Sequence, residues 1–306
     1  MKLSAKSKKY LKLVAKIILT IIALLYIYYK IDLKAVAEII RRTNFYMIYP
    51  AILLFVVSKV LSSFRLTFFL RCIPISMSER ENLRLYWLGM FYNLFLPGGI
   101  GGDGYKVFYI NQEFKAKVKT TIWAILLDRV IGLLALFCLA VGLSYIVPFP
   151  EKWKYLVWSL IPLSILIAFF VMRWFFRKFS KVFWITNLYS LLVQLAQVGA
   201  AFFILKGIGI RENILLYLFL FLISSIISVL PITIGGLGAR EVTFVIASQW
   251  FLIDVNGSIT LSLVFYMITA LVSLVGIYYT FNYNKIKHGR ILESEIPDKK
   301  DDKDIR

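Results

Sequence analysis

A glycine-rich stretch at residues 96–106, LPGGIGGDGYK, combines residue types that suit the binding of a phosphate group. Glycines allow an anion to approach the backbone closely, because they carry no side chain. We predict a helix that begins just after Gly104, at Tyr105, so that its free N–H groups and partial positive charge face the same loop. Lys106 adds a full positive charge within one turn. The stretch therefore predicts a phosphate contact, with a tightly packed turn as the alternative.

A second stretch, LPITIGGLGAR at residues 230–240, aligns on the first without gaps. A predicted helix follows Gly238 and begins at Ala239, with Arg240 and Glu241 in its first turn. The same residue types therefore recur in the same order, and a second phosphate contact is predicted here. The recurrence also predicts that the chain contains an internal repeat.

The common catalytic patterns are missing from the sequence. It has no GxSxG, no HExxH, no carboxylate pair at a useful spacing and one histidine, His288. Cys72 and Cys138 form no CxxC or zinc pattern. The glycines at 99–104 match the dinucleotide fingerprint GxGxxG, but no strand is predicted before them. Asp103 suits helix capping better than base catalysis. We therefore predict a protein without enzymatic activity, cofactor or metal site.

The elements that must position these residues are membrane-spanning helices. The 306 residues are 60% hydrophobic and 16% aromatic, with a mean hydropathy of +0.77, and several apolar runs reach the ~20 residues that cross a bilayer. The net charge of +19 is explained by basic residues that flank membrane spans rather than by nucleic-acid binding. We predict an all-α polytopic membrane protein, with a single membrane domain at 1–281 and a charged cytoplasmic tail at 282–306.

Six full spans are predicted, at about 12–29, 45–70, 120–147, 154–175, 183–206 and 258–281. Two further apolar regions, 85–110 and 212–253, are broken by Pro and Gly, and each is predicted to be a re-entrant hairpin. For 212–253, two full spans remain an alternative. Each half of the chain, about 12–147 and 154–281, then holds three spans and one hairpin. An odd number of spans inverts the second half in the membrane, and inverted repeats are typical of transporters.

The distribution of basic residues predicts the orientation. Most of the 36 Lys and Arg residues fall in loops on the side of the N-terminus, which places both termini in the cytoplasm, in a multi-pass protein of the cell (inner) membrane. The first apolar run is a retained anchor, because no small-residue cleavage site follows it. Lys16 and Arg65 lie near span ends, so we expect their long side chains to reach the interface.

Charges inside the spans are costly and usually face a partner or a substrate path. Asp128 and Arg129 point about 100° apart on a helix, so they cannot pair with each other. We predict Asp103 as the partner of Arg129, and Lys106 or Lys59 as the partner of Asp128. An internal salt bridge that fixes helix packing is the alternative to a substrate path.

Three motifs, in order along nearly the whole chain, resemble the lysylphosphatidylglycerol synthase transmembrane-region family. They are NLFLPGGIGGDGYKVFYI (93–110), LLDRVIGLL (126–134) and LPITIGGLGAREVTFV (230–245). In the larger members of that family this membrane part acts as a flippase for aminoacylated phosphatidylglycerol, and a separate cytosolic domain attaches the amino acid. The 306 residues leave no room for that domain, so the resemblance implies the membrane part only.

The resemblance also implies site residues. The GGD, DR and GGxGxRE motifs of the family correspond here to Gly101, Gly102, Asp103, Asp128, Arg129, Gly235, Gly236, Gly238, Arg240 and Glu241. Lys106 stands after the GGD motif, where the family often has Arg. Lys keeps the positive charge, but it cannot form the two parallel hydrogen bonds that a guanidinium group makes to a phosphate.

We therefore expect a translocator of a phosphate-bearing lipid such as aminoacylated phosphatidylglycerol, another anionic phospholipid or a polyprenyl phosphate. Lys106, Arg240 and Arg129 would hold the phosphate near mid-depth. Three carboxylates would bind a cationic headgroup or exchange partners during transport: Asp103, Asp128 and Glu241. No nucleotide motif is present, so transport would be passive or ion-coupled. Protein partners would be a second copy or a separate synthase. The alternatives are a non-transporting partner that presents lipid to a synthase or glycosyltransferase, and a lipid-modifying enzyme.

Overall fold

The computed structural model describes residues 33–95, 101–147, 150–229 and 238–281. In these ranges the chain is helical and contains no strand, which confirms the predicted all-α membrane fold. The first predicted span and the charged tail lie outside the described residues, as do parts of both glycine stretches.

Within the described ranges, five helices are long and apolar enough to cross a membrane. They are α3 (Phe45–Leu70), α6 (Val118–Leu143), α7 (Glu151–Phe175), α8 (Phe183–Gly207) and α11 (Val255–Ser273), which the short helix α12 (Val275–Phe281) continues. A helix such as α7, with 25 residues, is about 38 Å long, against the ~30 Å of a hydrocarbon core. These helices match five of the six predicted spans.

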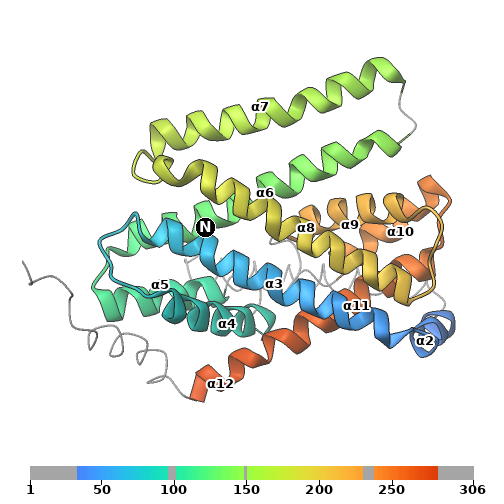
Figure 1. The fold of residues 1–306 in the computed structure, drawn as a ribbon, viewed down its shortest axis with the longest axis horizontal. Coiled ribbons are helices and arrows are strands. Elements are labelled where there is room, and N and C mark those ends of the chain that lie inside the picture. The colour runs from blue at the N-terminus through green and yellow to red at the C-terminus, as the bar shows by residue number, and fades with distance from the viewer. Residues whose placement is uncertain (1–32, 96–100, 148–149, 230–237, 282–306) are drawn as a thin grey trace, which may run out of the picture.

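Four shorter helices form two hairpins. They are α4 (Glu79–Phe95), α5 (Gly101–Phe114), α9 (Ile214–Val229) and α10 (Ala239–Phe251). The 13 residues of α10, which is followed by the described residue Leu252, extend only about 20 Å, too short for a full span. In Figure 1 the α4–α5 pair lies at one end of the long helices and the α9–α10 pair at the other end. The lengths therefore favour a hairpin, rather than two spans, in the second broken region.

Three further short helices are α2 (Leu33–Arg41), η1 (Ser144–Ile146) and η2 (Ser180–Val182). Side-chain caps explain where two of the long helices begin. The Asn44 side chain accepts a hydrogen bond from the Tyr46 N–H at the start of α3, at 3.0 Å. Asp254 accepts hydrogen bonds from the Asn256 and Gly257 N–H groups at the start of α11.

The order of helices repeats along the chain. The series α3, α4, α5, α6 has 26, 17, 14 and 26 residues, and the series α8, α9, α10, α11 has 25, 16, 13 and 19. Each hairpin also packs against the last long helix of the other series, since α4 contacts α11 and α9 contacts α6. This reciprocal packing of the two series supports the predicted inverted repeat, which stays a prediction.

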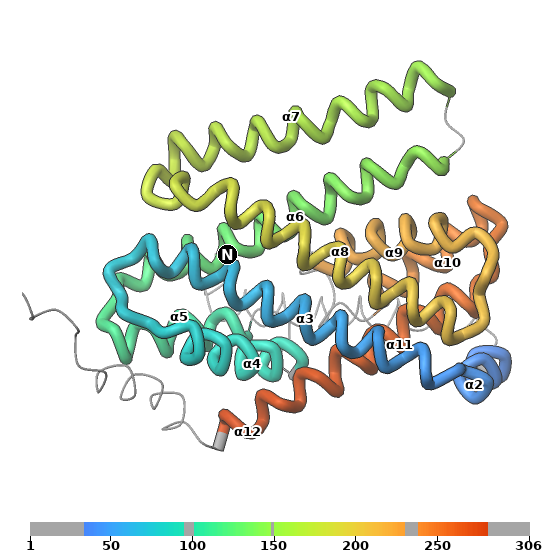
Figure 2. The backbone as a smooth tube through the Cα atoms, in the orientation of Figure 1, coloured from blue at the N-terminus to red at the C-terminus, as the bar shows by residue number. Residues whose placement is uncertain are grey.

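The centre of the molecule is the pair α3 and α8, which lie alongside each other (Figure 2). Next to them, the Phe265 ring packs edge-on against Phe55 of α3 and Phe221 of α9, with centroids 5.4 and 4.8 Å apart. This aromatic group joins the two helix series close to the charged residues described below.

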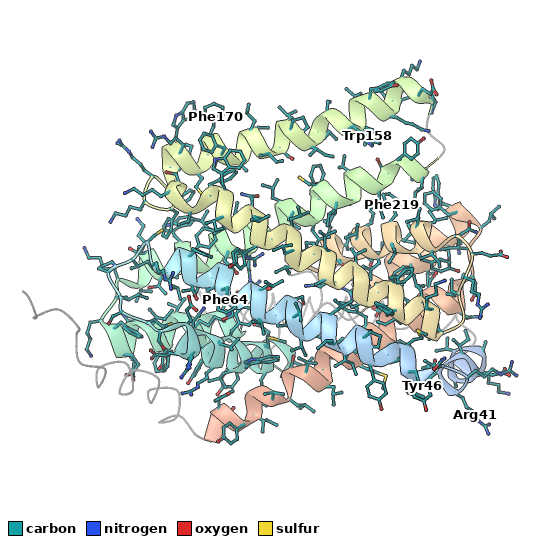
Figure 3. The ribbon with its side chains drawn as sticks, in the orientation of Figure 1. Arg41, Tyr46, Phe64, Trp158, Phe170 and Phe219 are labelled. Atoms are coloured by element: carbon teal, nitrogen blue, oxygen red, sulfur yellow. The ribbon has the colours of Figure 1, made fainter. Side chains whose placement is uncertain are left out.

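Helix α7 stands at the periphery and packs mainly on α6. Only 6% of its most apolar stretch is buried. Trp158 and Phe170, labelled near its two ends in Figure 3, are 40% and 42% exposed. Lipid chains are as apolar as such side chains, so a helix of this kind is compatible with lipid on most of its surface.

Candidate functional site

Eight charged residues from four helices form what we call the central charge cluster. They are Lys59 and Arg65 of α3, Asp103 and Lys106 of α5, Asp128 and Arg129 of α6, and Arg240 and Glu241 of α10.

A bidentate contact in the cluster joins Arg65 to Asp128. Arg65 donates from Nε to Asp128 Oδ1 at 2.7 Å and from Nη2 to Oδ2 at 3.0 Å, and from Nη1 to Ser190 Oγ of α8 at 2.9 Å. Both charged residues are 6% exposed. A Cβ atom on Gly132 would lie 2.8 Å from Arg65 Nη1, so the absence of a side chain there makes room for the guanidinium group. This bidentate geometry satisfies both charged groups within the protein.

Two predictions about these residues are wrong. The partner of Asp128 is Arg65, rather than Lys106 or Lys59. Arg65 does not extend to the interface, because a carboxylate from α6 and a hydroxyl from α8 pair with its guanidinium group inside the protein. For Asp128 the internal salt bridge, given above as the alternative, is the arrangement observed. The other predicted interface residue, Lys16, lies outside the described residues.

The predicted pairing of Arg129 with Asp103 is confirmed, since Arg129 Nε contacts Asp103 Oδ2. Lys106 shares the same carboxylate, with Nζ 3.4 Å from Asp103 Oδ1. The Lys106 ammonium also lies 4.2 Å from the centre of the Tyr86 ring of α4. Asp103 and Lys106 are buried. Asp103 lies in the first turn of α5, where a carboxylate is favoured by the helix dipole.

In the first glycine stretch, the described glycines allow α4 and α5 to pack closely together. Helix α5 begins at Gly101 rather than at Tyr105, so the GGD residues form its first turn. A Cβ atom on Gly102 would come within 1.8 Å of the Gly89 carbonyl oxygen of α4. The Gly102 N–H donates to Asn93 Oδ1 at 2.8 Å, so a side chain of α4 already satisfies it. At Gly102, therefore, the structure supports the tightly packed turn.

Helix α10 begins at Ala239, as predicted. Gly238 precedes it with φ of 85°, a conformation that favours glycine. The Gly238 N–H donates to Glu241 Oε2 at 2.9 Å, and Ser262 Oγ of α11 donates to Glu241 Oε1 at 2.7 Å. Glu241 therefore caps its own helix and ties it to α11. Gly235 and Gly236 lie outside the described residues.

Arg240 has a different environment from its neighbour. Its guanidinium group lies 5.1 Å from the centre of the Phe221 ring and 5.0 Å from that of Phe265. Nη2 donates to Ser225 Oγ at 3.1 Å, whereas Nε is buried without a hydrogen-bond partner among the described residues. Among the described residues, Arg240 is thus held by aromatic rings and one hydroxyl, and its Nε donor has no partner there.

Lys59 completes the cluster from α3. Its ammonium lies 4.4 Å from the centre of the Phe55 ring. Arg65, Lys106 and Arg240 are close enough for their charges to act on it. Cations from α3, α5 and α10, which belong to both helix series, therefore converge on one region. Such a concentration of positive charge is suited to an anionic group.

The comparisons with known proteins bear on the identity of the chain. The family model described as "Lysylphosphatidylglycerol synthase TM region" matches residues 13–187, more than half of the chain. The chain belongs to this family. A comparison with curated proteins finds no match.

In this lysylphosphatidylglycerol synthase transmembrane-region protein, the family match includes the GGD and DR residues and ends before α9 and α10. Within the described ranges, no group of three or more His, Cys, Asp and Glu residues has metal-binding geometry. Sequence analysis missed Asn93, Ser190 and Ser262, the polar groups that pair with the cluster or its helices. Isolated Ser and Asn residues in apolar helices were the available signal.

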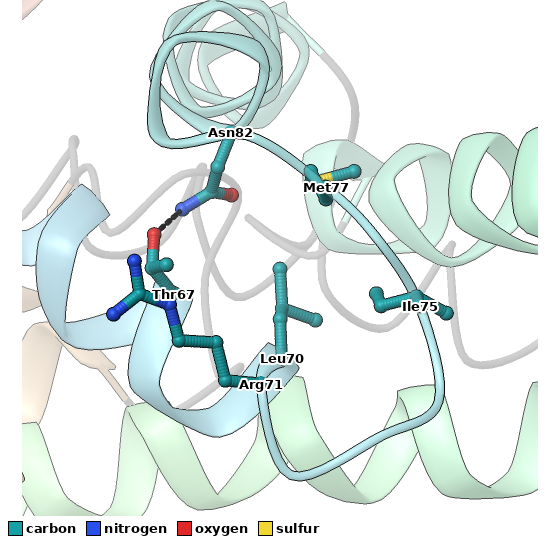
Figure 4. A pocket seen from close by; sticks show the side chains of 6 residues that line it. All are labelled: Thr67, Leu70, Arg71, Ile75, Met77 and Asn82. Atoms are coloured by element: carbon teal, nitrogen blue, oxygen red, sulfur yellow. Dashed lines mark hydrogen bonds between the residues drawn. The ribbon is translucent and has the colours of Figure 1, made fainter. Parts of the chain in front are cut away.

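A small cavity lies away from these residues, where α3 ends and α4 begins (Figure 4). It is lined by Thr67, Leu70, Arg71, Ile75, Met77 and Asn82. Its volume of about 10 Å³ has room for roughly one water molecule. Asn82 Nδ2 donates to Thr67 Oγ1 across it at 2.8 Å. A lipid headgroup does not fit there, so the central charge cluster is the candidate site in this family member.

Proposed function

We propose that this protein moves a phosphate-bearing lipid between the two leaflets of the cell membrane. The observation that carries the proposal is the convergence of Lys59, Lys106 and Arg240, from both helix series, on one region inside the bundle. Such a site would let a headgroup cross inside the protein while the acyl chains stay in the bilayer. Aminoacylated phosphatidylglycerol is the substrate that the family implies.

Charged side chains at membrane depth are energetically costly. A Lys or Arg at the centre of a span costs about 3 kcal/mol on insertion scales, and such residues are usually found where function requires them. A phosphate group that enters between these cations would offset part of that cost. The Nε donor of Arg240, buried without a hydrogen-bond partner in the described part of the chain, supports such a ligand.

The arrangement of hairpins suggests how access could alternate between the two sides. The α4–α5 and α9–α10 pairs lie at opposite ends of the long helices and bring Lys106 and Arg240 to the cluster. Movement of either hairpin would open the site toward its own side of the membrane. Transport is proposed to be passive or ion-coupled. The purified chain is proposed not to modify the lipid chemically.

The test is lipid movement in proteoliposomes that contain trace amounts of acyl-labelled fluorescent phosphatidylglycerol or lysylphosphatidylglycerol, read by chemical quenching of the outer leaflet. The wild-type protein should accelerate movement of at least one of the two. The Lys106→Gln/Arg240→Gln variant should lose tenfold or more of that rate, about 1.4 kcal/mol in the barrier.

The matched control for this test is Lys206→Gln, because Lys206 is an exposed cation over the Phe202 ring, outside the cluster. The control should move lipid like the wild type. Equal rates in a folded Lys106→Gln/Arg240→Gln variant and the wild type would refute the proposal.

A non-transporting role is the second candidate, and the Arg65–Asp128 contact favours it. That pair and Ser190 satisfy one another fully, which is typical of a fixed architecture. A protein of this kind would present lipid to a separate synthase or glycosyltransferase. Co-purification of such an enzyme in a one-to-one ratio, without lipid movement in liposomes, would support this candidate.

A further inference from the structure

The charge balance of the central cluster bears on which headgroup it accepts. All three of its carboxylates already have partners: Asp128 is paired with Arg65, Asp103 with Lys106 and Arg129, and Glu241 with the Gly238 N–H and the Ser262 hydroxyl. A headgroup ammonium that took one of these carboxylates would leave a buried cation or donor without its partner. Leaving a buried charge without its partner is strongly unfavourable.

Two cations stand outside these carboxylate contacts. Among the described residues, Lys59 and Arg240 have no carboxylate within ion-pair distance. The residues of the two glycine stretches outside the described ranges, 96–100 and 230–237, include no charged side chain that could neutralise them. The cluster therefore has two positive charges that its own carboxylates do not contact.

Aromatic rings are the other groups that bind ammonium ions in proteins. In this cluster the protein's own cations already lie over them: Lys59 over Phe55, Lys106 over Tyr86, and Arg240 over Phe221 and Phe265. An aminoacyl headgroup would have to displace one of these cations. The occupied rings, like the paired carboxylates, therefore disfavour binding of a headgroup that carries an ammonium group.

We infer that the cluster selects a phosphate headgroup that carries no ammonium group, and that it disfavours an aminoacylated headgroup. The inference rests on the proposed function for the location of the site, and it narrows the substrate to lipids of net negative charge. Phosphatidylglycerol and polyprenyl phosphates share this chemistry. The phosphate would contact Lys59 and the Nε donor of Arg240, neutralising the two cations that lack a carboxylate.

Binding selectivity tests this inference separately from transport. The purified full chain is equilibrated in detergent with equal amounts of phosphatidylglycerol, lysylphosphatidylglycerol and a short-chain polyprenyl phosphate, and bound lipid is quantified by native mass spectrometry. We expect at least one of the two anionic lipids to be retained at least tenfold more than lysylphosphatidylglycerol. Comparing the retention of phosphatidylglycerol with that of the polyprenyl phosphate then shows which of the two binds better. Equal or greater retention of lysylphosphatidylglycerol, or retention of none, overturns the inference.

Charge variants give the second readout. In Lys59→Gln and Arg240→Gln the preference for anionic lipid should fall several-fold, and in Lys59→Glu it should reverse toward lysylphosphatidylglycerol, because the new carboxylate binds an ammonium group. Lys206→Gln, with a similar Lys–Phe contact outside the cluster, should keep the wild-type preference. Variants that elute as monodisperse protein but keep the wild-type preference would contradict the inference.

The outcomes separate the two proposals. Selective retention of anionic lipid without movement in proteoliposomes would refute the proposed transport and leave the inference standing. Movement of lipid with equal or better retention of lysylphosphatidylglycerol would refute the inference and leave transport standing.

Discussion

Gly102 of α5 lies so close to Gly89 of α4 that a Cβ atom on Gly102 would come within 1.8 Å of the Gly89 carbonyl oxygen. This approach sets the separation of the two helices in the first hairpin. Gly89 also leaves room for Lys106, because a Cβ atom on Gly89 would lie 2.7 Å from Lys106 Cε. The glycines of this hairpin therefore provide the space in which the Lys106 side chain lies.

Gly102→Ala should destabilise the protein by about 2–3 kcal/mol, the upper part of the range for overpacking, because a backbone oxygen cannot move aside without parting the helices. The measurement is the thermal unfolding midpoint in detergent. Gly104→Ala is the control, since a Cβ atom at that position would meet no packing neighbour within 4 Å. An equal loss in both variants would show that helix packing is not the cause.

Removing one partner of the Arg65–Asp128 pair should be strongly destabilising. Asp128→Leu or Arg65→Met should cost about 3–5 kcal/mol, whereas Arg65→Met/Asp128→Leu should cost less than the sum of these two single changes, because no buried charge is left alone. Unfolding midpoints of the four proteins form a double-mutant cycle. The exposed pair Arg71–Glu79 provides the comparison.

Arg71→Gln should cost less than about 1 kcal/mol, as is usual for exposed ion pairs. If the single changes at Arg65 and Asp128 are no more costly than this, the contact between them contributes little to stability.

Glu241 should tolerate glutamine better than alanine. The amide of Gln can still accept a hydrogen bond from the Gly238 N–H and exchange one with the Ser262 hydroxyl, so Glu241→Gln should keep both stability and lipid movement. Glu241→Ala removes the cap and should lower stability by about 0.5–2 kcal/mol. Loss of lipid movement in a stable Glu241→Gln variant would indicate instead that the carboxylate itself contacts substrate.

The two hairpins should connect to the long helices on opposite sides of the membrane. In a variant without Cys72 and Cys138, a cysteine introduced by Lys117→Cys, before α6, should react with a membrane-impermeant maleimide only from the cytoplasmic side. One introduced by Arg211→Cys, before α9, should react only from outside. Both positions are exposed. Reaction of both from the same side would contradict the inverted arrangement.

The sequence was sufficient to predict the five described spans and the breaks at Pro and Gly that separate the shorter helices, because run length and the positions of Pro and Gly limit what a membrane helix can do. It also predicted the Asp103–Arg129 pair, since few charges were available inside the spans. It misplaced Arg65, because position near a span end suggests an interface side chain, and its partner is 63 residues away in sequence. Only the packing of α3 against α6 and α8 shows that the side chain turns inward.

The role of Glu241 was missed for a different reason. The sequence places it beside Arg240 in a motif that resembles a substrate site, and that likeness favoured a contact with lipid. The spacing from Gly238 to Glu241 is that of a capping box, in which the third helical residue bonds back to the residue before the helix. That local signal was readable, but its connection to Ser262 depends on how α11 packs.

The contact of Arg65 with α6 and α8 limits how the molecule can change shape. Three long helices meet at a single guanidinium group, and two of them, α3 and α8, come from different halves of the chain. Separating the halves at this depth would break that group's contacts, so the junction would act as a pivot around which other parts swing. Displacement would then grow with distance from Arg65, and the largest excursions would fall to the parts of the long helices farthest from it.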